Sequence, residues 1–221
     1  FAQKRVFRTT IGTNIKVVES NLLIDPKKIN EKIIISYFGS VYPGKGIERM
    51  LAFWKEIKDS DSQDEYRFKI IGEIGTDESN HFREYHEQVW KLIDELGLRD
   101  AIEVTGFVTD EEVSSEIAKS SVATLFYEDG LTLRRGSFLA YLAHGIPIVT
   151  SAGDDEAKEL FDGAKGICMA ANDKAAGEAL HRFAHLDQSE RETIRKENVT
   201  LSGNFDWKEI ASGFLRDYEI L

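Results

Sequence analysis

The stretch EDGLTLRRGSFLAYLAHGIPIVTSAG, residues 128–153, decides the fold. It begins where an apolar run ends, in a turn and a polar loop that carries two arginines. A short apolar segment then opens at Gly136-Ser137 and stops at His144-Gly145, and a second apolar run follows. This order predicts a strand, a loop, a helix and a strand, with Ser137 as the helix N-cap and Gly145 as its C-terminal stop.

The start of that helix suits an anion. A helix N-terminus offers unpaired backbone N–H groups and a partial positive charge. Arg134 and Arg135 stand directly before it, and arginine binds phosphate oxygens through paired hydrogen bonds. The alternative interpretation is that both arginines are solvated loop charges. Their position between a strand and Gly136-Ser137 favours a phosphate or diphosphate site.

The composition is typical of a soluble globular protein, with 42% hydrophobic and 30% charged residues. The net charge of -11 argues against nucleic acid or an anionic membrane surface as a partner. Cys168 is the single cysteine, which rules out an internal disulfide and fits a reducing compartment. No apolar stretch reaches membrane-spanning length, so we expect no membrane span and a cytoplasmic location. The chain begins at Phe1, and we expect it to be part of something longer.

Strands alternate with helices along the chain. Apolar, β-branched runs predict strands at 32–38, 66–71, 102–105, 122–127, 148–150 and 166–170. Helical periodicity and capping residues predict helices from 47, at about 80–96, at 109–119, 138–143, 154–161, 174–184 and 189–200, and at 207–221. Before them, 10–18 is β-leaning and is predicted as a strand or two, with a break at Asp25-Pro26. The pattern predicts an α/β fold, a Rossmann-like open parallel sheet with helices on both faces.

Ligands of such sheets bind outside the carboxyl ends of the strands. Four glycine-bearing loops would meet there: Gly39–Lys45, Gly72–Gly75, Gly106–Val108 and Glu128–Ser137. For any single loop, a glycine that only makes a tight turn is the simpler interpretation. Four such loops on one edge favour a binding cleft.

Motifs of several other functions do not occur in the sequence. No Gly-x-Gly-x-x-Gly follows the first strand, and the Gly-Lys at 44–45 lacks the Ser or Thr of a P-loop. No Gly-x-Ser-x-Gly elbow of a hydrolase is present. His81 with His86 and His181 with His185 do not form a metalloprotease pattern, because no Glu lies next to His181. We predict that both pairs are surface histidines.

Taken in order, the motifs resemble the C-terminal, donor-binding domain of a glycosyltransferase of family 4, a retaining family with the GT-B fold. The resemblance runs from about Ile33 to the final helix. The landmarks are Phe38-Gly39-Ser40 with Lys45-Gly46, Ile71-Gly72-Glu73-Ile74-Gly75, Val104-Thr105-Gly106-Phe107-Val108, the stretch Leu142–Thr150, and Phe205-Asp206-Trp207.

The resemblance also implies a domain organisation. A GT-B enzyme has two such domains facing each other across a cleft, and this chain would supply one of them. Residues 1–31 would be the interdomain connection, 32–205 the nucleotide-sugar-binding domain, and 206–221 a helix that crosses to a missing N-terminal domain. Because that other domain binds the acceptor, we expect this chain alone to lack transferase activity.

The resemblance further implies a donor site without metal or other cofactor. The expected ligands of the donor phosphates are Lys45, Arg134, Arg135, Gly136, Ser137 and Ser40. Those of the nucleobase are Gly106, Phe107, Val108 and Gly72, and the expected catalytic carboxylates, which face the sugar, are Glu128 and Asp129.

Two positions depart from the usual family pattern. Ser40 stands where the family has an Arg, and Ala140 stands where it has the Glu that holds the donor ribose. The Asp-Gly…Arg-Arg-Gly-Ser loop is similar to that of a subset of the family. We expect Arg134 or Arg135 to supply the positive charge that Ser40 lacks.

The predicted function is retaining transfer of a hexosyl group from a nucleotide sugar to a glycan or a lipid-linked acceptor, as in polysaccharide biosynthesis. Two alternatives stay open. A sugar-nucleotide epimerase uses the same two-domain fold, and a degenerate domain would bind a nucleotide without any chemistry.

Overall fold

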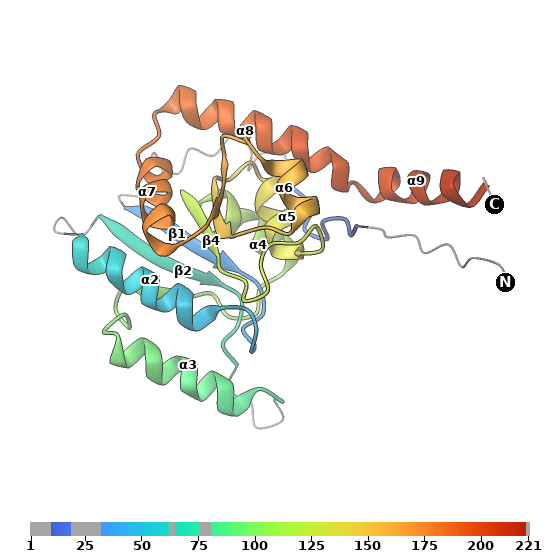
Figure 1. Ribbon diagram of the computed structural model, residues 1–221. Helices are drawn as coiled ribbons and strands as arrows, with labels where there is room; N and C mark the ends of the chain where they lie inside the picture. Colours follow the sequence, from blue (N-terminus) through green and yellow to red (C-terminus); the bar gives the residue numbers. More distant parts are fainter. Residues whose placement is uncertain (1–9, 19–31, 62–64, 76–80, 220–221) are drawn as a thin grey trace.

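A six-stranded parallel sheet forms the centre of the molecule, with the strand order β3-β2-β1-β4-β5-β6 (Figure 1). The computed structural model describes residues 10–18, 32–61, 65–75 and 81–219. The strands are β1 (Ile33–Phe38), β2 (Tyr66–Ile71), β3 (Ile102–Val104), β4 (Val122–Leu125), β5 (Ile148–Ser151) and β6 (Ile167–Ala170). Every pairing between neighbouring strands is parallel. The predicted open parallel sheet is therefore confirmed.

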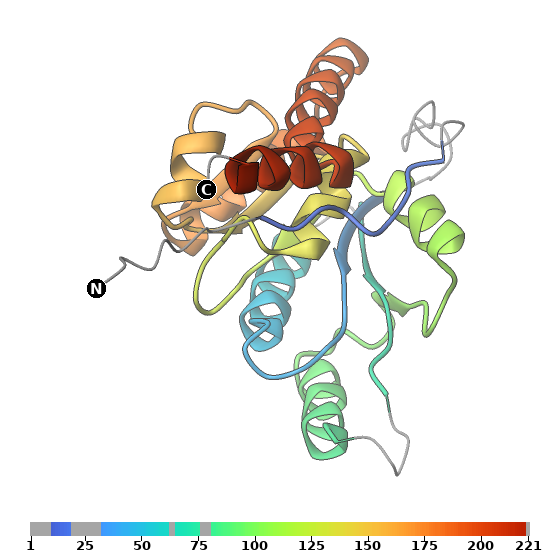
Figure 2. The same cartoon turned by 90° about the vertical axis from the view of Figure 1, so that its right-hand side faces the viewer.

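Helices cover both faces of this sheet. The helices of the described residues are α2 (Ile47–Ser60), α3 (Arg83–Glu95), α4 (Asp110–Ala118), α5 (Gly136–Ala143), α6 (Asp155–Phe161), α7 (Asp173–Ala184), α8 (Gln188–Ser202), the 3-10 turn η2 (Gly203–Phe205) and α9 (Trp207–Glu219), which projects from the body. α2 and α4 lie on opposite sides of the sheet (Figure 2). α7 contacts β4, β5 and β6, and α8 packs on α5. β1, β2 and β3 follow one another toward one edge of the sheet, whereas β4 lies on the other side of β1. Because crossovers between parallel strands are right-handed, the connection through α4 lies on the opposite face from α2 and α3.

The core forms where the aromatic side chain of α2 meets the central strands. Trp54 has no exposed surface, and its ring stacks on Phe68 of β2 with a centroid distance of 5.0 Å. Its indole N–H donates to the hydroxyl of Thr124 in β4 at 2.9 Å. A large buried ring with a satisfied polar tip fixes α2 against both strands.

α5 is a short helix that lies in the core. All its residues from Phe138 to Ala143 are buried, and the Tyr141 hydroxyl meets the Ser36 hydroxyl of β1 at 2.7 Å. Gly145 follows the helix with φ 72°, which confirms it as the C-terminal stop. The predicted N-cap is wrong. Arg135 occupies that position without a side-chain bond, because the Ser137 hydroxyl turns instead to the hydroxyl of Tyr127.

The β-leaning segment 10–18 forms no strand, contrary to the prediction. Ile15 packs into the core, and the Val18 N–H donates to the Ser114 hydroxyl at 3.3 Å. β-branched residues favour a half-buried extended surface, and here that surface is supplied by helices rather than by a neighbouring strand. The expected break at Asp25-Pro26 lies outside the described residues.

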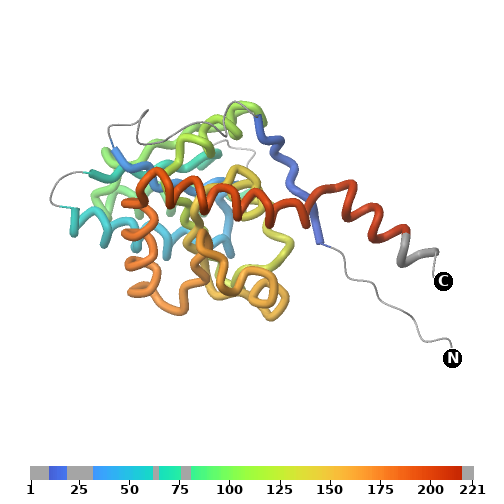
Figure 3. Tube along the Cα trace, turned by 90° about the horizontal axis from the view of Figure 1, so that it is seen from above, coloured from blue at the N-terminus to red at the C-terminus, as the bar shows by residue number. Residues whose placement is uncertain are grey.

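α9 leaves the layered body and continues outward from the end of α8 (Figure 3). The N-terminal segment lies beside its first turn, where a Cβ on Gly12 would come within 2.7 Å of the Trp207 ring. Within the described part of the chain, no helix is both long enough and apolar enough to cross a bilayer.

Candidate functional site

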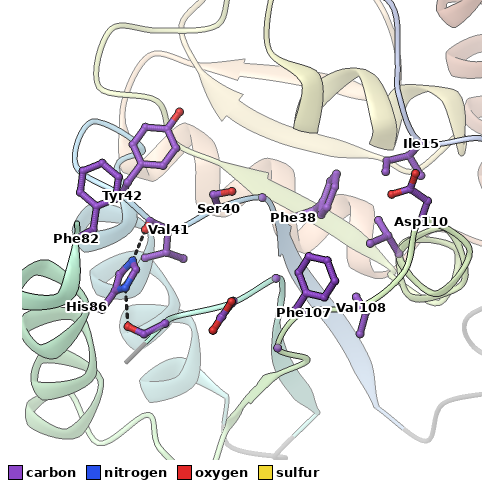
Figure 4. Close-up of a pocket in the computed structure, with 16 residues that line it drawn as sticks. Ile15, Phe38, Ser40, Val41, Tyr42, Phe82, His86, Phe107, Val108 and Asp110 are labelled. Atoms are coloured by element: carbon purple, nitrogen blue, oxygen red, sulfur yellow. Dashed lines mark hydrogen bonds between the residues drawn. The ribbon is translucent and has the colours of Figure 1, made fainter. Parts of the chain in front are cut away.

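A cavity of about 610 Å³ opens at the carboxyl ends of β1, β2 and β3 (Figure 4). That volume is in the usual range of small-molecule sites, roughly 300–1,000 Å³. It is lined by the loops that follow the three strands, together with parts of segment 10–18, α3 and α4. The lining residues from the loops include Gly39, Ser40, Val41, Tyr42, Gly72, Glu73, Gly75, Gly106, Phe107 and Val108.

Two of these loops touch backbone to backbone. Gly72 has φ 141°, and a Cβ built on it would lie 2.7 Å from the carbonyl oxygen of Gly39. The Gly72 N–H donates to the hydroxyl of Thr105, at the end of β3, at 3.0 Å. Glycine is needed here for both its backbone conformation and its lack of a side chain. The close contact holds three strand ends together at the base of the cavity.

The loop at Ser40 is held by a hydrogen bond from the end of β1. The buried hydroxyl of Tyr37 donates to the Ser40 carbonyl at 3.1 Å. Burial raises the pKa of Tyr37 well above its ordinary value, so this phenol stays protonated and remains a donor. The backbone of the loop is thus fixed while the Ser40 side chain faces the cavity.

The loop between β4 and α5 adjoins the cavity but does not line it. Ser137 is its nearest point, since a Cβ on Gly39 would lie 3.8 Å from the Ser137 Cβ. The Ser137 and Tyr127 hydroxyls are 3.0 Å apart. Burial raises the pKa of Tyr127, although the Ser137 hydroxyl and the Arg135 guanidinium act in the opposite direction. A neutral phenol therefore lies at the start of α5.

The two arginines of this loop have different environments. Arg135 is largely buried, and its guanidinium lies 4.5 Å from the ring centroid of Tyr127. It also forms an ion pair with Asp129 and donates to the Gly130 carbonyl at 3.3 Å. The Arg134 side chain is exposed. Arg135 thus stabilises the loop itself, whereas Arg134 presents its charge to solvent.

Aromatic side chains form the rim of the cavity. Tyr42 stacks on Phe82 with ring centroids 5.7 Å apart, and the Lys45 ammonium lies 4.7 Å from the Tyr42 ring centroid. On the opposite side of the cavity in Figure 4, the Phe107 side chain is 90% exposed. A ring this exposed gains almost nothing from folding, which makes it a candidate for contact with a ligand.

His86 is buried, so the prediction that it is a surface histidine is wrong. It is 6% exposed and shares the inner face of α3 with Val89 and Ile93. That spacing of three and four residues was visible in the sequence and could have placed it inside. The other predicted surface pair, His181 and His185, is exposed as expected.

The structure brings some of the predicted site residues together and leaves others apart. Those that line the cavity are Ser40, Gly72, Gly106, Phe107 and Val108. The others lie outside the lining, in the adjoining loops and at the start of α5: Lys45, Glu128, Asp129, Arg134, Arg135, Gly136 and Ser137.

Among the lining side chains that were not predicted as site residues are Tyr42, Phe82, His86 and Asp110. Three of them lie on α3, on α4 or at the loop tip before α2, away from the glycines that marked the strand ends. Within the described ranges, no cluster of three His, Cys, Asp or Glu side chains could hold a metal ion. Metal independence stays a prediction.

A family model described as glycosyl transferases group 1 matches residues 32–185. In a sequence comparison with curated proteins, no match was found.

Solved structures with a similar fold include sucrose-phosphate synthase from Thermosynechococcus elongatus, with a TM-score of 0.70 and 19% identity over 95% of this chain and 51% of that one. HepE from Anabaena, solved with UDP and glucose, has a TM-score of 0.68 and 15% identity over 94% of this chain and 54% of that one. The pneumococcal O-GlcNAc transferase GtfA, solved with UDP and GlcNAc, has a TM-score of 0.63 and 16% identity over 95% of this chain and 38% of that one.

The chain thus spans about half of the first two neighbours and less of the third. At these identities the similarity concerns the fold, which is that of one half of a GT-B enzyme.

Proposed function

Since this chain belongs to the group 1 glycosyl transferases, we propose that it binds the nucleotide-sugar donor of a retaining, metal-independent transfer of a hexosyl group. The observation that carries the proposal is the convergence of three strand-end loops on one cavity, with the start of α5 beside it. Open parallel sheets bind ligands at this edge. Two of the neighbours in fold were solved with UDP.

The nucleobase would occupy the part of the cavity formed by Gly106, Phe107 and Val108, with Gly72 beneath it. Exposed backbone N–H and C=O groups in this loop can read the edge of a base. The Phe107 ring is free to lie on the face of the base, a contact of about 1–3 kcal/mol. This arrangement supports the predicted base site.

The diphosphate would extend from the cavity toward Ser40 and Ser137. Ser40 offers a hydroxyl in place of the usual arginine, and α5 adds the partial positive charge of its N-terminus. Lys45 and Arg134 then supply the full charges from the two sides, because Arg135 is already paired with Asp129. Charge-assisted bonds from these cations would stabilise the departing nucleoside diphosphate without a metal.

The sugar would face the carboxylates of the same loop. Glu128 and Asp129 are both exposed at the turn after β4. Asp129 is held by Arg135, while the charge of Glu128 reaches Tyr85 of α3, whose pKa is raised by burial, by Glu48 and by Glu128. Of the two, Glu128 is better placed to act directly on the sugar.

The acceptor, a glycan or a lipid-linked sugar, would bind to a second domain. α9 exposes a run of large apolar side chains, Trp207 at 50%, Phe214 at 51% and Leu215 at 60%. Such a surface on a projecting helix suits a protein contact. We assign residues 206–221 to that contact, 1–31 to the interdomain connection and 32–205 to donor binding. The cytoplasmic location is proposed on the single cysteine alone.

A degenerate nucleotide-binding domain remains the second candidate. Ser40 and Ala140 replace the usual Arg and Glu, and Arg135 is occupied by Asp129. An epimerase-like enzyme would bind the same donor. The candidates separate in the complete two-domain protein. A transferase transfers sugar to an acceptor, an epimerase converts the donor, and a degenerate domain does neither.

Donor binding is tested by calorimetric titration of UDP, GDP and ADP and their glucose esters into the chain. Lys45→Ala or Arg134→Ala should weaken binding by roughly ten- to a hundredfold, since each removes a charge-assisted bond. Lys174→Ala on α7 is the matched control, because that ammonium is 87% exposed and lies far along the chain from the cavity loops. The proposal fails if a nucleotide binds and neither substitution weakens it more than the control.

A further inference from the structure

His86 joins two of the cavity loops through both nitrogens of its ring. Its Nδ1 lies 2.6 Å from the carbonyl oxygen of Gly75, after β2, and its Nε2 lies 2.6 Å from that of Val41, after β1 (Figure 4). The side chain comes from the first turns of α3 and is 6% exposed. It therefore bridges two loops from beneath the cavity rim.

Both contacts are hydrogen bonds only if each of the two ring nitrogens carries a proton. A carbonyl oxygen only accepts hydrogen bonds, while a neutral imidazole has one N–H and one lone pair. The imidazolium form donates from both nitrogens. In the neutral form, one lone pair would face a carbonyl oxygen at 2.6 Å, and that contact would turn from attraction to repulsion.

The buried His144 shows the opposite pattern in the same chain. Its Nδ1 lies 2.7 Å from the Ala140 carbonyl, and its Nε2 lies 2.8 Å from the Ser114 hydroxyl. A hydroxyl can donate, so these contacts suit a neutral ring. Burial lowers the pKa of His144, although the bond to the carbonyl acts the other way. A buried histidine of this chain can thus have contacts that suit a neutral ring, and it is the two carbonyl acceptors that distinguish His86.

The titratable groups around His86 come from several elements. The titratable groups that share the cavity are Tyr42 after β1, Glu73 after β2 and Asp110 at the start of α4. No Lys or Arg lines the cavity in the described part of the chain.

The neighbour on its own helix is Tyr85, at a ring distance of 6.2 Å. Tyr85 is in turn coupled to Glu48 of α2 and Glu128 of the β4–α5 loop. Cations are present as well: the Lys45 ammonium stands over the Tyr42 ring, which stacks on Phe82, and Arg83 of the same helix pairs with Glu87.

A shift of either loop would reach the proposed phosphate site. Val41 directly follows Ser40, and the backbones of Gly39 and Gly72 already touch. If one hydrogen bond of His86 were lost, the loop that accepts it would no longer be held by the imidazole at Val41 or at Gly75. The contact between Gly39 and Gly72 would remain. The cavity would keep its residues but lose the fixed spacing between the two loops.

We propose that His86 is a positioning residue for the donor: as an imidazolium it ties the loops after β1 and β2 into the geometry that binds the nucleotide sugar, and loss of its proton loosens that geometry. This inference rests on the proposed function for its ligand, but not for its protonation state. His86 does not touch the reacting atoms in this account.

The test with ligand uses UDP-glucose, titrated calorimetrically between about pH 5.5 and about pH 8.5, the range in which histidines change charge. Both phosphates of UDP-glucose are esterified, so its charge stays constant, unlike that of UDP, whose terminal phosphate has a pKa of about 6. The parent should bind about tenfold more weakly at the upper end, as expected for the loss of one hydrogen bond to a charged group.

Two variants and a control complete this titration. His86→Gln and His86→Ala should bind more weakly than the parent at about pH 6 and show no dependence on pH. His81→Gln is the matched control, because His81 precedes the same helix and is exposed, and it should behave as the parent does. A parent with constant affinity, or a pH slope that survives in His86→Gln, would overturn the proposal.

A measurement without ligand keeps the inference testable even if UDP-glucose does not bind, which would count against the proposed function alone. Nitrogen NMR of the His86 ring in the free chain should show both nitrogens protonated at about pH 6. The protection factors of the amides in the loops 39–46 and 72–75, which correct for base-catalysed exchange, should then fall as the pH rises. A ring with only one protonated nitrogen at about pH 6, together with loop protection factors that do not change with pH, would refute the proposal.

Discussion

Replacing Gly72 by alanine should destabilise the fold and disturb the cavity at once. A side chain at φ 141° is strained, and the new Cβ would lie 2.7 Å from the Gly39 carbonyl oxygen. Such a backbone conformation costs about 1–3 kcal/mol for a residue other than glycine. The carbonyl belongs to the backbone and cannot rotate away, so the loop must move as well. We expect a total loss of roughly 2–4 kcal/mol in the free energy of unfolding.

Gly177→Ala is the matched control for this substitution. Gly177 lies inside α7, and a Cβ built on it would meet no atom within 4 Å. Alanine has the higher helix propensity, so this variant should be more stable than the parent by about 0.5–1 kcal/mol. The same chemical change is therefore expected to have opposite signs at the two positions.

Guanidinium denaturation with linear extrapolation measures both effects. Amide chemical shifts of the Gly72→Ala variant should also change around Gly39 and Thr105, the two residues that the Gly72 backbone contacts. Unfolding free energies within about 0.5 kcal/mol of each other for the two variants would refute the packing described for these loops.

Three further predictions follow from single side chains. Arg135→Ala should cost about 1–2 kcal/mol of stability through its lost stacking and ion pair, while Arg134→Ala should stay within about 0.5 kcal/mol of the parent in the same denaturation assay. Phe107→Ala should leave stability unchanged but weaken nucleotide binding roughly five- to a hundredfold in calorimetry, and equal affinity would remove Phe107 from the base site. Burial acts to raise the pKa of Glu116, but hydrogen bonds from its two lysine partners lower it overall. Its stabilising effect is therefore present above the unfolded pKa of about 4.3 and is lost as the pH falls through the lower pKa of the folded state. Glu116→Gln should be less stable at about pH 7 and lose less on acidification, and an unchanged pH profile would contradict this.

The fold was predictable because strand and helix signals agree along most of the chain. β1 lies at Ile33–Phe38, within the predicted range 32–38, because a nearly continuous β-branched and aromatic run is typical of a strand buried on both faces of a parallel sheet. The capping box of Thr109 and Glu112 is present as predicted. Both signals depend on neighbours in the sequence, and local chemistry was sufficient to read them.

Contacts between distant segments account for the errors. The Ser137 hydroxyl could have capped its own helix, but Tyr127 offers a partner from the preceding strand end. Segment 10–18 carries strand propensity without a strand to pair with, and it packs against helices instead. The spacing of His86 with Val89 and Ile93 could have placed it inside, but its acceptors, the carbonyls of Val41 and Gly75, come from two other loops and could not be read from that spacing.

The candidate site was predictable as a set of loops but not as a set of side chains. Glycines mark the strand ends, so the loops at Ser40, Gly72 and Gly106 were found to line one cavity. The difference between Arg134 and Arg135 could not be read from two adjacent identical residues. It arises because only Arg135 faces the ring of Tyr127.

The most direct test of the central claim is an amide NMR map of the chain with and without saturating UDP. If the chain binds a nucleotide-sugar donor as proposed, the shifts that change should cluster in the loops 39–46, 72–75 and 106–108 and at Gly136-Ser137. These segments are far apart in the sequence and meet only at the carboxyl edge of the sheet. Shift changes confined to the separate cavity between α7 and α8, around Phe183 and Ile194, or no changes with UDP, GDP or ADP, would contradict the account.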